Sequence, residues 1–356
     1  MIERYRKPVV VSGGNEGPHL STLQDGASRG LISVGGSIHR GTWAANFGLV
    51  SEKEEYLHCF SSRGPAMDGL LKPDVVAPIY WLAAVSPLDS RPLMECRVAG
   101  NPNLPKGYAL IRGTSFSNPA TAGALALLIS AAKQEKVAYD AERIHLALRA
   151  SARFLDGYGA HEQGSGVVNV PRAWEQLKKA RQPVLITSRG PLRTALPPWT
   201  KPVSEGGGLF EREGWSAGQK EVRTLVLRRS SGPDEAVRYH LMWTGNDGTF
   251  ATSKDITLPR DKDVSLSVDV APRTPGVHSA ILRLSADPDG PAVHQVATTI
   301  VAAHHFPAEK GRPLVVTGEA EWASHERCIF RSTREGQLFD SRSLSRTGKC
   351  GVAHGV

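Results

Sequence analysis

The sequence predicts an α/β domain at residues 1–180 followed by an all-β sandwich at about 215–305. In the first part, short continuous apolar runs alternate with helical segments, which is typical of parallel strands covered on both faces. In the second part the hydrophobic period changes to two, which indicates half-buried strands. A stretch rich in Pro and Gly at 181–214 separates the two parts and is interpreted as a linker.

The strands of the first domain are expected at 8–14, 31–35 and 73–78, where apolar residues run without a break. Turn residues bound each run, as expected for strands of a parallel sheet.

Three helices are expected in the same domain, at 115–133, at 140–152 and after Asn169. The first is apolar nearly all round, so we expect it to be buried, with Ser115 or Ser117 as its N-cap. Asp140 is the expected cap of the second helix.

The sandwich is predicted from five segments in which apolar and polar residues alternate. These segments are residues 222–229, 237–244, 263–270, 277–286 and 293–302. Residues 306–356 show no clear period and are interpreted as a loosely ordered tail.

Composition excludes several functions. The chain of 356 residues is 40% hydrophobic and has no apolar run long enough for a membrane span. Its net charge is +8, and 12 Lys or Arg against 5 Asp or Glu place +7 of that charge between Arg172 and Arg229. Aromatic residues are not interleaved with these cations, so no nucleic-acid partner is predicted.

The 4 cysteines lack metal-ligand spacing, so no metal or other cofactor is expected. They are interpreted as free thiols, although Cys328 and Cys350 could pair if the protein is exported. The compartment itself is not predicted.

The strongest chemical signal is the segment GTSFSNP at 113–119, which opens the first helix. A serine at a helix N-terminus can attack a carbonyl, while the helix dipole and its own backbone N–H stabilise the resulting oxyanion. Ser115 is therefore a candidate nucleophile. The alternative is an ordinary serine cap on a buried helix.

A second signal is VVVSGGNEGP at 9–18, in which a strand runs into glycines and Asn15. An Asn amide donates a hydrogen bond without titrating, which suits an oxyanion hole. The alternative is a turn residue with a positive φ angle.

Two further segments follow in order, FSSRGP at 60–65 and KPDVVAP at 72–78. With these four segments, and SGVVNVPRAW at 165–174, the chain over about 8–180 resembles the subtilisin-like serine peptidase family. The spacing, with a sandwich directly behind, resembles the tripeptidyl-peptidase-II-like branch.

The resemblance implies a subtilisin-like parallel sheet with flanking helices and hydrolysis of peptide bonds in a peptide or protein substrate. Ser115 would be the nucleophile and Asn15 the oxyanion donor, and no metal or organic cofactor is implied. The segments 60–65 and 74–78 would support the substrate cleft.

The chain departs from the family where the catalytic Asp and His are expected. In subtilisin both precede the serine in the order Asp, His, Ser. Only 14 residues precede Asn15, and no D-[ST]-G or H-G-T segment occurs. We therefore expect the domain to be incomplete at its N-terminus and to need a missing N-terminal peptidase segment as a partner. One of His19, His39 and His58 could be recruited as the general base, but a loop or surface role is favoured for each of them.

Two smaller departures are Ile79, where the family usually has Gly, and Phe116, where it usually has Met. Three explanations of the missing residues remain open. The chain is a truncated or cleaved fragment, which we favour, or one half of a split enzyme, or a non-catalytic peptide-binding or interaction module derived from a peptidase.

Overall fold

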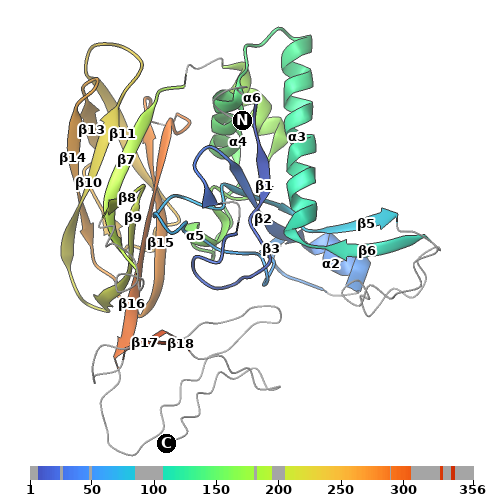
Figure 1. The fold of residues 1–356 in the computed structure, drawn as a ribbon, viewed down its shortest axis with the longest axis horizontal. Coiled ribbons are helices and arrows are strands. Elements are labelled where there is room, and N and C mark those ends of the chain that lie inside the picture. Colours follow the sequence, from blue (N-terminus) through green and yellow to red (C-terminus); the bar gives the residue numbers. More distant parts are fainter. Residues whose placement is uncertain are drawn as a thin grey trace, which may run out of the picture.

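The computed structural model describes residues 7–24, 27–47, 50–84, 107–179, 183–194, 205–288, 290–305, 329–331 and 338–340. Figure 1 shows two parts side by side: an α/β domain and a sandwich of antiparallel and parallel strands. The predicted fold class is confirmed.

The α/β domain is built on a 4-stranded sheet. Its strands are β1 (Val10–Ser12), β2 (Ile32–His39), β3 (Glu55–Leu57) and β4 (Val75–Pro78). The central strand β2 pairs in parallel with β1 on one side and β4 on the other, and its far end pairs antiparallel with β3. Every residue of β2 except His39 is buried, as its continuous apolar run predicts.

Helices cover this sheet and an arm extends from it. The helices are α2 (Arg40–Phe47), α3 (Thr114–Gln134), α4 (Ala141–Ser151), α5 (Ala160–Gln163) and α6 (Val170–Lys178). The arm is the hairpin of β5 (Tyr80–Ala84) and β6 (Tyr108–Arg112), which points away from the sandwich (Figure 1). One core joins β2 and β4 to α3, α4 and α6, with Val34, Val75, Leu128 and Leu148 among its residues.

The helix ends only partly follow the sequence prediction. Asp140 caps α4, and its side chain accepts a hydrogen bond from Arg143 N, as expected. The predicted cap of α3 was wrong, because Gly113 is its N-cap and no side chain caps it. Ser115 and Ser117 therefore lie inside the first turn of α3, and Ser115 is exposed.

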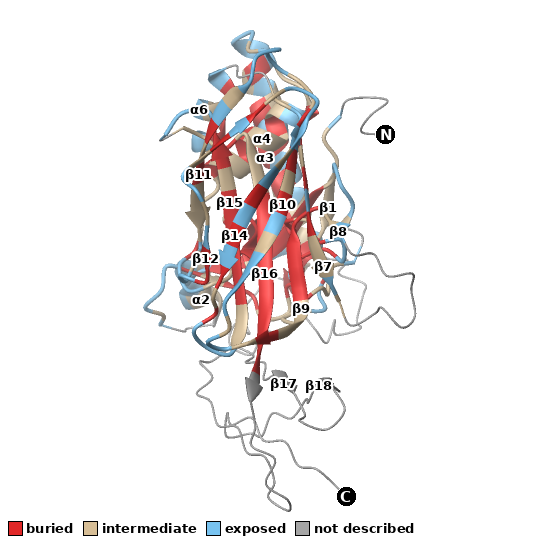
Figure 2. Ribbon diagram, turned by 90° about the vertical axis from the view of Figure 1, so that its left-hand side faces the viewer, coloured by how far each residue is buried: buried red, intermediate tan, exposed pale blue. Residues whose placement is uncertain are grey.

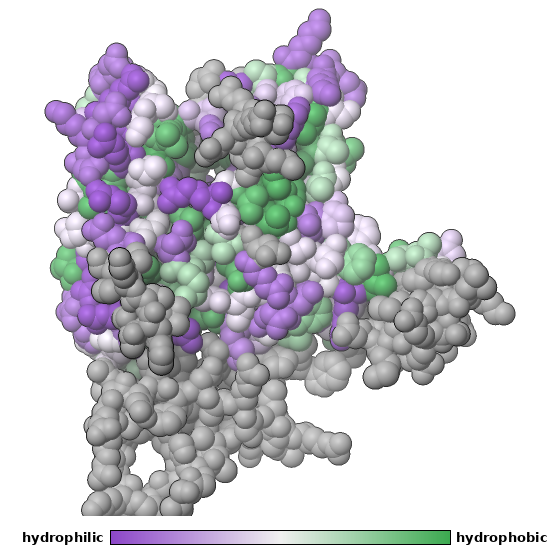
Figure 3. Space-filling view, viewed as in Figure 1, coloured by the Kyte–Doolittle hydropathy of each residue, from purple (hydrophilic) through white to green (hydrophobic). Residues whose placement is uncertain are grey.

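The expectation that α3 is buried all round was also wrong. One side carries Leu125 and Leu128 into the core, while Gly123, Ala126 and Leu127 are exposed. Figure 3 shows hydrophobic surface on the face where β1 and α3 lie in Figure 1. This face of α3 is thus apolar but does not pack against the described residues.

Neighbouring leucines on α3 should therefore respond differently to truncation. Leu128 is 1% exposed and Leu127 is 64% exposed. Leu128→Ala leaves a cavity and should lower the free energy of unfolding by ~2–5 kcal/mol, whereas Leu127→Ala should change it by no more than about 0.5 kcal/mol. Urea unfolding of both variants measures this. A large loss at Leu127 would mean that another surface covers it.

The sandwich contains most of the remaining strands. They are β7 (Ile186–Arg193), β8 (Glu205–Gly206), β9 (Leu209–Ser216), β10 (Glu221–Arg229), β11 (Val237–Thr244), β12 (Phe250–Ala251), β13 (Asp255–Leu258), β14 (Asp263–Val270), β15 (Gly276–Ser285) and β16 (His294–His305). They are hydrogen-bonded in the order β12-β14-β10-β7-β9-β16-β15-β11-β13. Buried residues run along β15 and β16 (Figure 2), and the core includes Trp215, Leu225 and Val268.

The sandwich begins earlier than the sequence indicated. Strands β7 and β8 and most of β9 lie within the stretch predicted as a linker at 181–214. The glycine run 206–208 is a site of close backbone approach. A Cβ on Gly206 would lie 2.1 Å from the Asp68 carbonyl oxygen, and one on Gly208 would lie 2.5 Å from that of Gly69.

The predicted tail at 306–356 lies outside the described residues except for two short strands. These are β17 (Ile329–Arg331), which pairs with β16, and β18 (Leu338–Asp340), which pairs with β17. Cys96, Cys328 and Cys350 also lie outside the described residues, while Cys59 is a free thiol.

Candidate active site

The loop after β1 meets the first residue of α3, although 99 residues separate them along the chain. Thr114 makes two hydrogen bonds to one atom of Asn15. Its backbone N–H donates to Asn15 Oδ1 at 2.9 Å, and its hydroxyl donates to the same oxygen at 3.0 Å. Gly14 N in turn donates to Thr114 Oγ1 at 3.3 Å. The two segments singled out from the sequence are thus held against each other.

These bonds fix the orientation of the Asn15 amide. Because Oδ1 accepts both hydrogens from Thr114, the other end of the amide, the Nδ2 donor, is turned away from Thr114. Nδ2 lies 3.6 Å from the point where a Cβ on Gly113 would stand, and Ser115 N lies 3.8 Å from the same point. Both nitrogens therefore lie within 3.8 Å of one point beside Gly113.

Gly113 leaves that position open. Its φ angle is +143°, a conformation that side-chain-bearing residues rarely adopt. Its backbone N–H donates to the Ile79 carbonyl oxygen at 3.3 Å, which ties the turn to the end of β4. An acceptor oxygen could approach the backbone here without meeting a side chain on residue 113.

Ser115 is the second residue of α3 and is exposed. The first N–H groups of a helix have no partner within it, and the helix dipole makes this end positive. A negative charge forming on an oxygen beside Ser115 would be stabilised by both effects. The geometry suits attack on a carbonyl group.

The segment FSSRGP at 60–65 is hydrogen-bonded to the Asn15 loop. Ser62 Oγ accepts a hydrogen bond from Glu16 N at 3.0 Å, and the Gly17 N–H donates to the Phe60 carbonyl oxygen at 2.8 Å. Ser61 Oγ accepts from Gly36 N at 2.9 Å, which connects the same segment to β2. These contacts position the loop.

Asp74, in the KPDVVAP segment, is buried in an ionic network away from Ser115. Its carboxylate accepts from Lys72 Nζ at 2.6 Å, from Ser33 N at 2.8 Å, and pairs with His145 Nε2 at 2.9 Å. Burial alone would raise the pKa of Asp74, but Lys72, His145 and Arg149 hold it well below its usual value. Asp74 is thus an ionised structural residue that fixes β4 beside β2.

The three histidines considered as recruits have contacts with residues other than Ser115. His39 is exposed and pairs with Glu54 at 3.8 Å. His58 is buried and shares a hydrogen bond of 2.9 Å with the Tyr80 hydroxyl. His19 is half-buried in the turn whose carbonyl oxygen accepts from Thr22 Oγ1.

Sequence reasoning missed Thr114, the residue that orients Asn15. It stands between two residues that were singled out, yet its hydroxyl contacts are long-range and leave no local signal.

Within the described ranges, no three His, Cys, Asp or Glu side chains are grouped to hold a metal ion. Among the described helices, none has the length and hydrophobicity to cross a membrane.

The fold and site together define a class: an α/β domain of the serine-peptidase type followed by an Ig-like β-sandwich. Residues 4–167 match the subtilase family, and residues 187–302 match the Ig-like domain in actinomycete serine proteases. The α/β domain of this chain belongs to the subtilase family.

Relatives among characterised proteins are large peptidases. Pyrolysin from Pyrococcus furiosus is 31% identical over 199 residues, and tripeptidyl-peptidase 2 from Caenorhabditis elegans is 30% identical over 181 residues; each match covers 50% of this chain. Tripeptidyl-peptidase 2 from Drosophila melanogaster is 25% identical over 329 residues, or 88% of this chain. The chain spans only 13%, 12% and 21% of these proteins.

The crystal structure of a tripeptidyl peptidase 2 shares the fold. It superposes on 90% of this chain with a TM-score of 0.61, at 21% identity, and the match covers 24% of that protein. The resemblance to the tripeptidyl-peptidase-II-like branch is therefore confirmed, and it extends across both domains.

Proposed function

We propose that this chain supplies the nucleophile and the oxyanion hole of a serine peptidase that cleaves peptide bonds through an acyl-enzyme. Ser115 Oγ attacks the scissile carbonyl carbon. Asn15 Nδ2 and the Ser115 backbone N–H then donate hydrogen bonds to the oxygen that becomes negative. The observation that carries this proposal is the pair of hydrogen bonds that Thr114 donates to Asn15 Oδ1. These bonds leave Nδ2 as a donor beside the helix N-terminus.

The general base and its carboxylate partner come, in this proposal, from polypeptide other than the described residues. A serine hydroxyl keeps its proton at neutral pH unless a base accepts it. In the described part of the chain, His58 is hydrogen-bonded to Tyr80 and His145 to Asp74. His39 lies 3.8 Å from Glu54. In this proposal the Ser115 hydroxyl of the described part of the chain is a weak nucleophile until such a base is supplied.

A fluorophosphonate probe tests the first half of this proposal. We expect purified protein to remain unlabelled at Ser115 over hours at pH 7.5, because nothing in the described site deprotonates the hydroxyl. Peptide mapping by mass spectrometry would locate any adduct. Strong labelling of Ser115 that disappears in Ser115→Ala would show that a base is already present.

The alternative is a module that binds peptides without cleaving them. It shares the exposed start of α3 but gives Ser115 no chemical role. Adding the missing N-terminal peptidase segment distinguishes the peptidase from the binding module. Probe labelling and peptide cleavage that appear only with that segment support the peptidase, and unchanged inertness supports the binding module.

A further inference from the structure

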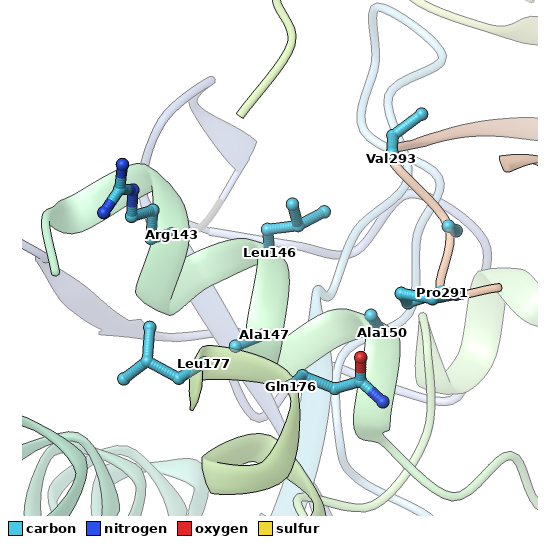
Figure 4. Close-up of a pocket in the computed structure, with 9 residues that line it drawn as sticks. Arg143, Leu146, Ala147, Ala150, Gln176, Leu177, Pro291 and Val293 are labelled. Atoms are coloured by element: carbon cyan, nitrogen blue, oxygen red, sulfur yellow. The ribbon is translucent and has the colours of Figure 1, made fainter. Parts of the chain in front are cut away.

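The sandwich packs directly against the α/β domain through a small apolar cluster. Leu71, Phe154 and Ala160 contribute from the α/β domain, and Ile281 and Ala297 contribute from β15 and β16. A pocket lies between α4, α6 and residues 291–293 (Figure 4). Apolar side chains from both domains thus meet at the interface.

Polar contacts also cross the interface. The His161 backbone N–H donates to Ser279 Oγ at 3.0 Å, which joins α5 to β15. Gln295 Oε1, on β16, accepts from Arg149 Nε at 2.8 Å and from Ser165 Oγ at 3.1 Å. Since Arg149 also lies 3.9 Å from Asp74, this contact connects the sandwich to the network that fixes β4.

Two histidines lie at these contacts with a ring nitrogen that is buried and has no hydrogen-bond partner. The first is His161, where the atom is Nδ1. Burial lowers the pKa of His161 to about 4; Glu162 opposes this shift and Arg63 adds to it. Glu162 is already paired with Arg63 at 3.4 Å, so it offers little to a protonated ring.

The second is His294, the first residue of β16, whose Nε2 is buried without a partner. The charged groups that act on it, Arg149 from α4 and Arg29 from the loop before β2, are both cationic. Burial and these two charges lower the pKa of His294 to about 3. Both histidines are therefore neutral when the domains are docked.

We propose that acid opens this interface, with His161 and His294 as its two proton-sensitive contacts. A proton on either ring would place a charge on a buried nitrogen that no acceptor meets, next to an arginine. In this proposal, undocking exposes both rings to water, where each can be protonated freely. The proposal concerns the joint between the domains and holds whether or not the chain is a peptidase.

The direction and size follow from proton linkage. A histidine exposed by undocking has a pKa of about 6.5, above its value in the docked state. Docking is therefore at full strength above pH 6.5 and weakens as the pH falls toward the docked pKa values. Each histidine shifts the opening equilibrium by about 15-fold between pH 6.5 and pH 5, approaching tenfold per pH unit only well below pH 6.5.

Hydrogen exchange of the full chain, followed by mass spectrometry at pH 7 and pH 5, tests this. The protection of the 160–163 amides, including the His161 N–H bonded to Ser279, should fall by about 20-fold or more at pH 5 after correction for intrinsic exchange. Amides of β10, inside the sandwich core, should keep their protection. In His161→Gln/His294→Gln the loss at 160–163 should shrink to less than threefold.

His240→Gln is the matched control. His240 pairs with Asp255 within the sandwich and lies outside the interface, so this variant should open with acid as the wild type does. The proposal is overturned if the wild-type 160–163 amides stay protected at pH 5, or if the double variant opens like the wild type. Should the double variant not fold, each single variant should remove one histidine's share, and the wild-type titration alone still decides.

Discussion

Replacement of Ser115 by alanine should abolish peptide hydrolysis once the chain is combined with a segment that supplies the base. Without Oγ no acyl-enzyme can form, and what remains is substrate binding and the two N–H donors. Removal of the nucleophile from subtilisin costs ~10⁶ in kcat, and we expect a loss of that order here. Steady-state kinetics on a peptide substrate measures it.

Ser130→Ala is the matched control for this change. Ser130 is an exposed serine on the same helix, and its hydroxyl accepts only from the Gln134 side chain at 3.1 Å. The control should retain full kcat and KM. If Ser115→Ala kept more than a hundredth of the activity, the nucleophile would have to be sought elsewhere.

Asn15→Ala should have the second largest effect, because it deletes one of the two donors to the oxyanion. The corresponding loss in subtilisin is ~10²–10³ in kcat. KM should change little, since the full charge on that oxygen exists in the transition state and not in the bound substrate. The structure strengthens this expectation, because Thr114 already holds the amide oxygen and leaves Nδ2 to donate.

Asn15→Gly separates this role from that of a turn residue. Glycine accepts any φ angle that Asn15 adopts, so a purely conformational role would leave kcat near the wild-type value. Thr114→Val adds a second readout. It removes one of the two bonds that orient the amide but keeps the backbone N–H bond, and should lower kcat by less than Asn15→Ala. Equal activity in all three variants would contradict the oxyanion role.

The sequence by itself determined the order of chemistry-bearing segments and the change in hydrophobic period. GTSFSNP at the start of a helix is local information, and so are the cap at Asp140 and the helix start after Asn169, because a cap bonds an N–H within three residues. Alternation over eight or more residues likewise marked β10 and β14, where the two faces of each strand differ in burial.

Only the tertiary structure decided the contacts between distant segments. The pairing of Asn15 with Thr114 spans 99 residues, and no pattern in either segment shows which end of the amide faces the helix. Asp74 is a similar case. Its segment was expected near the substrate cleft, but Lys72 and His145 meet around the carboxylate only after β4 and α4 pack together.

The boundary of the sandwich and the exposed side of α3 also depended on packing. Residues 181–214 carry Pro and Gly like a linker, yet β7 lies beside β10 and β9 beside β16, and Gly206 and Gly208 serve backbone approach to Asp68 and Gly69. The apolar residues of α3 encircle the helix, so periodicity could not say which side is covered. The hydrophobicity of a segment indicates that its surface is to be buried. Which neighbour buries that surface depends on how distant segments fold.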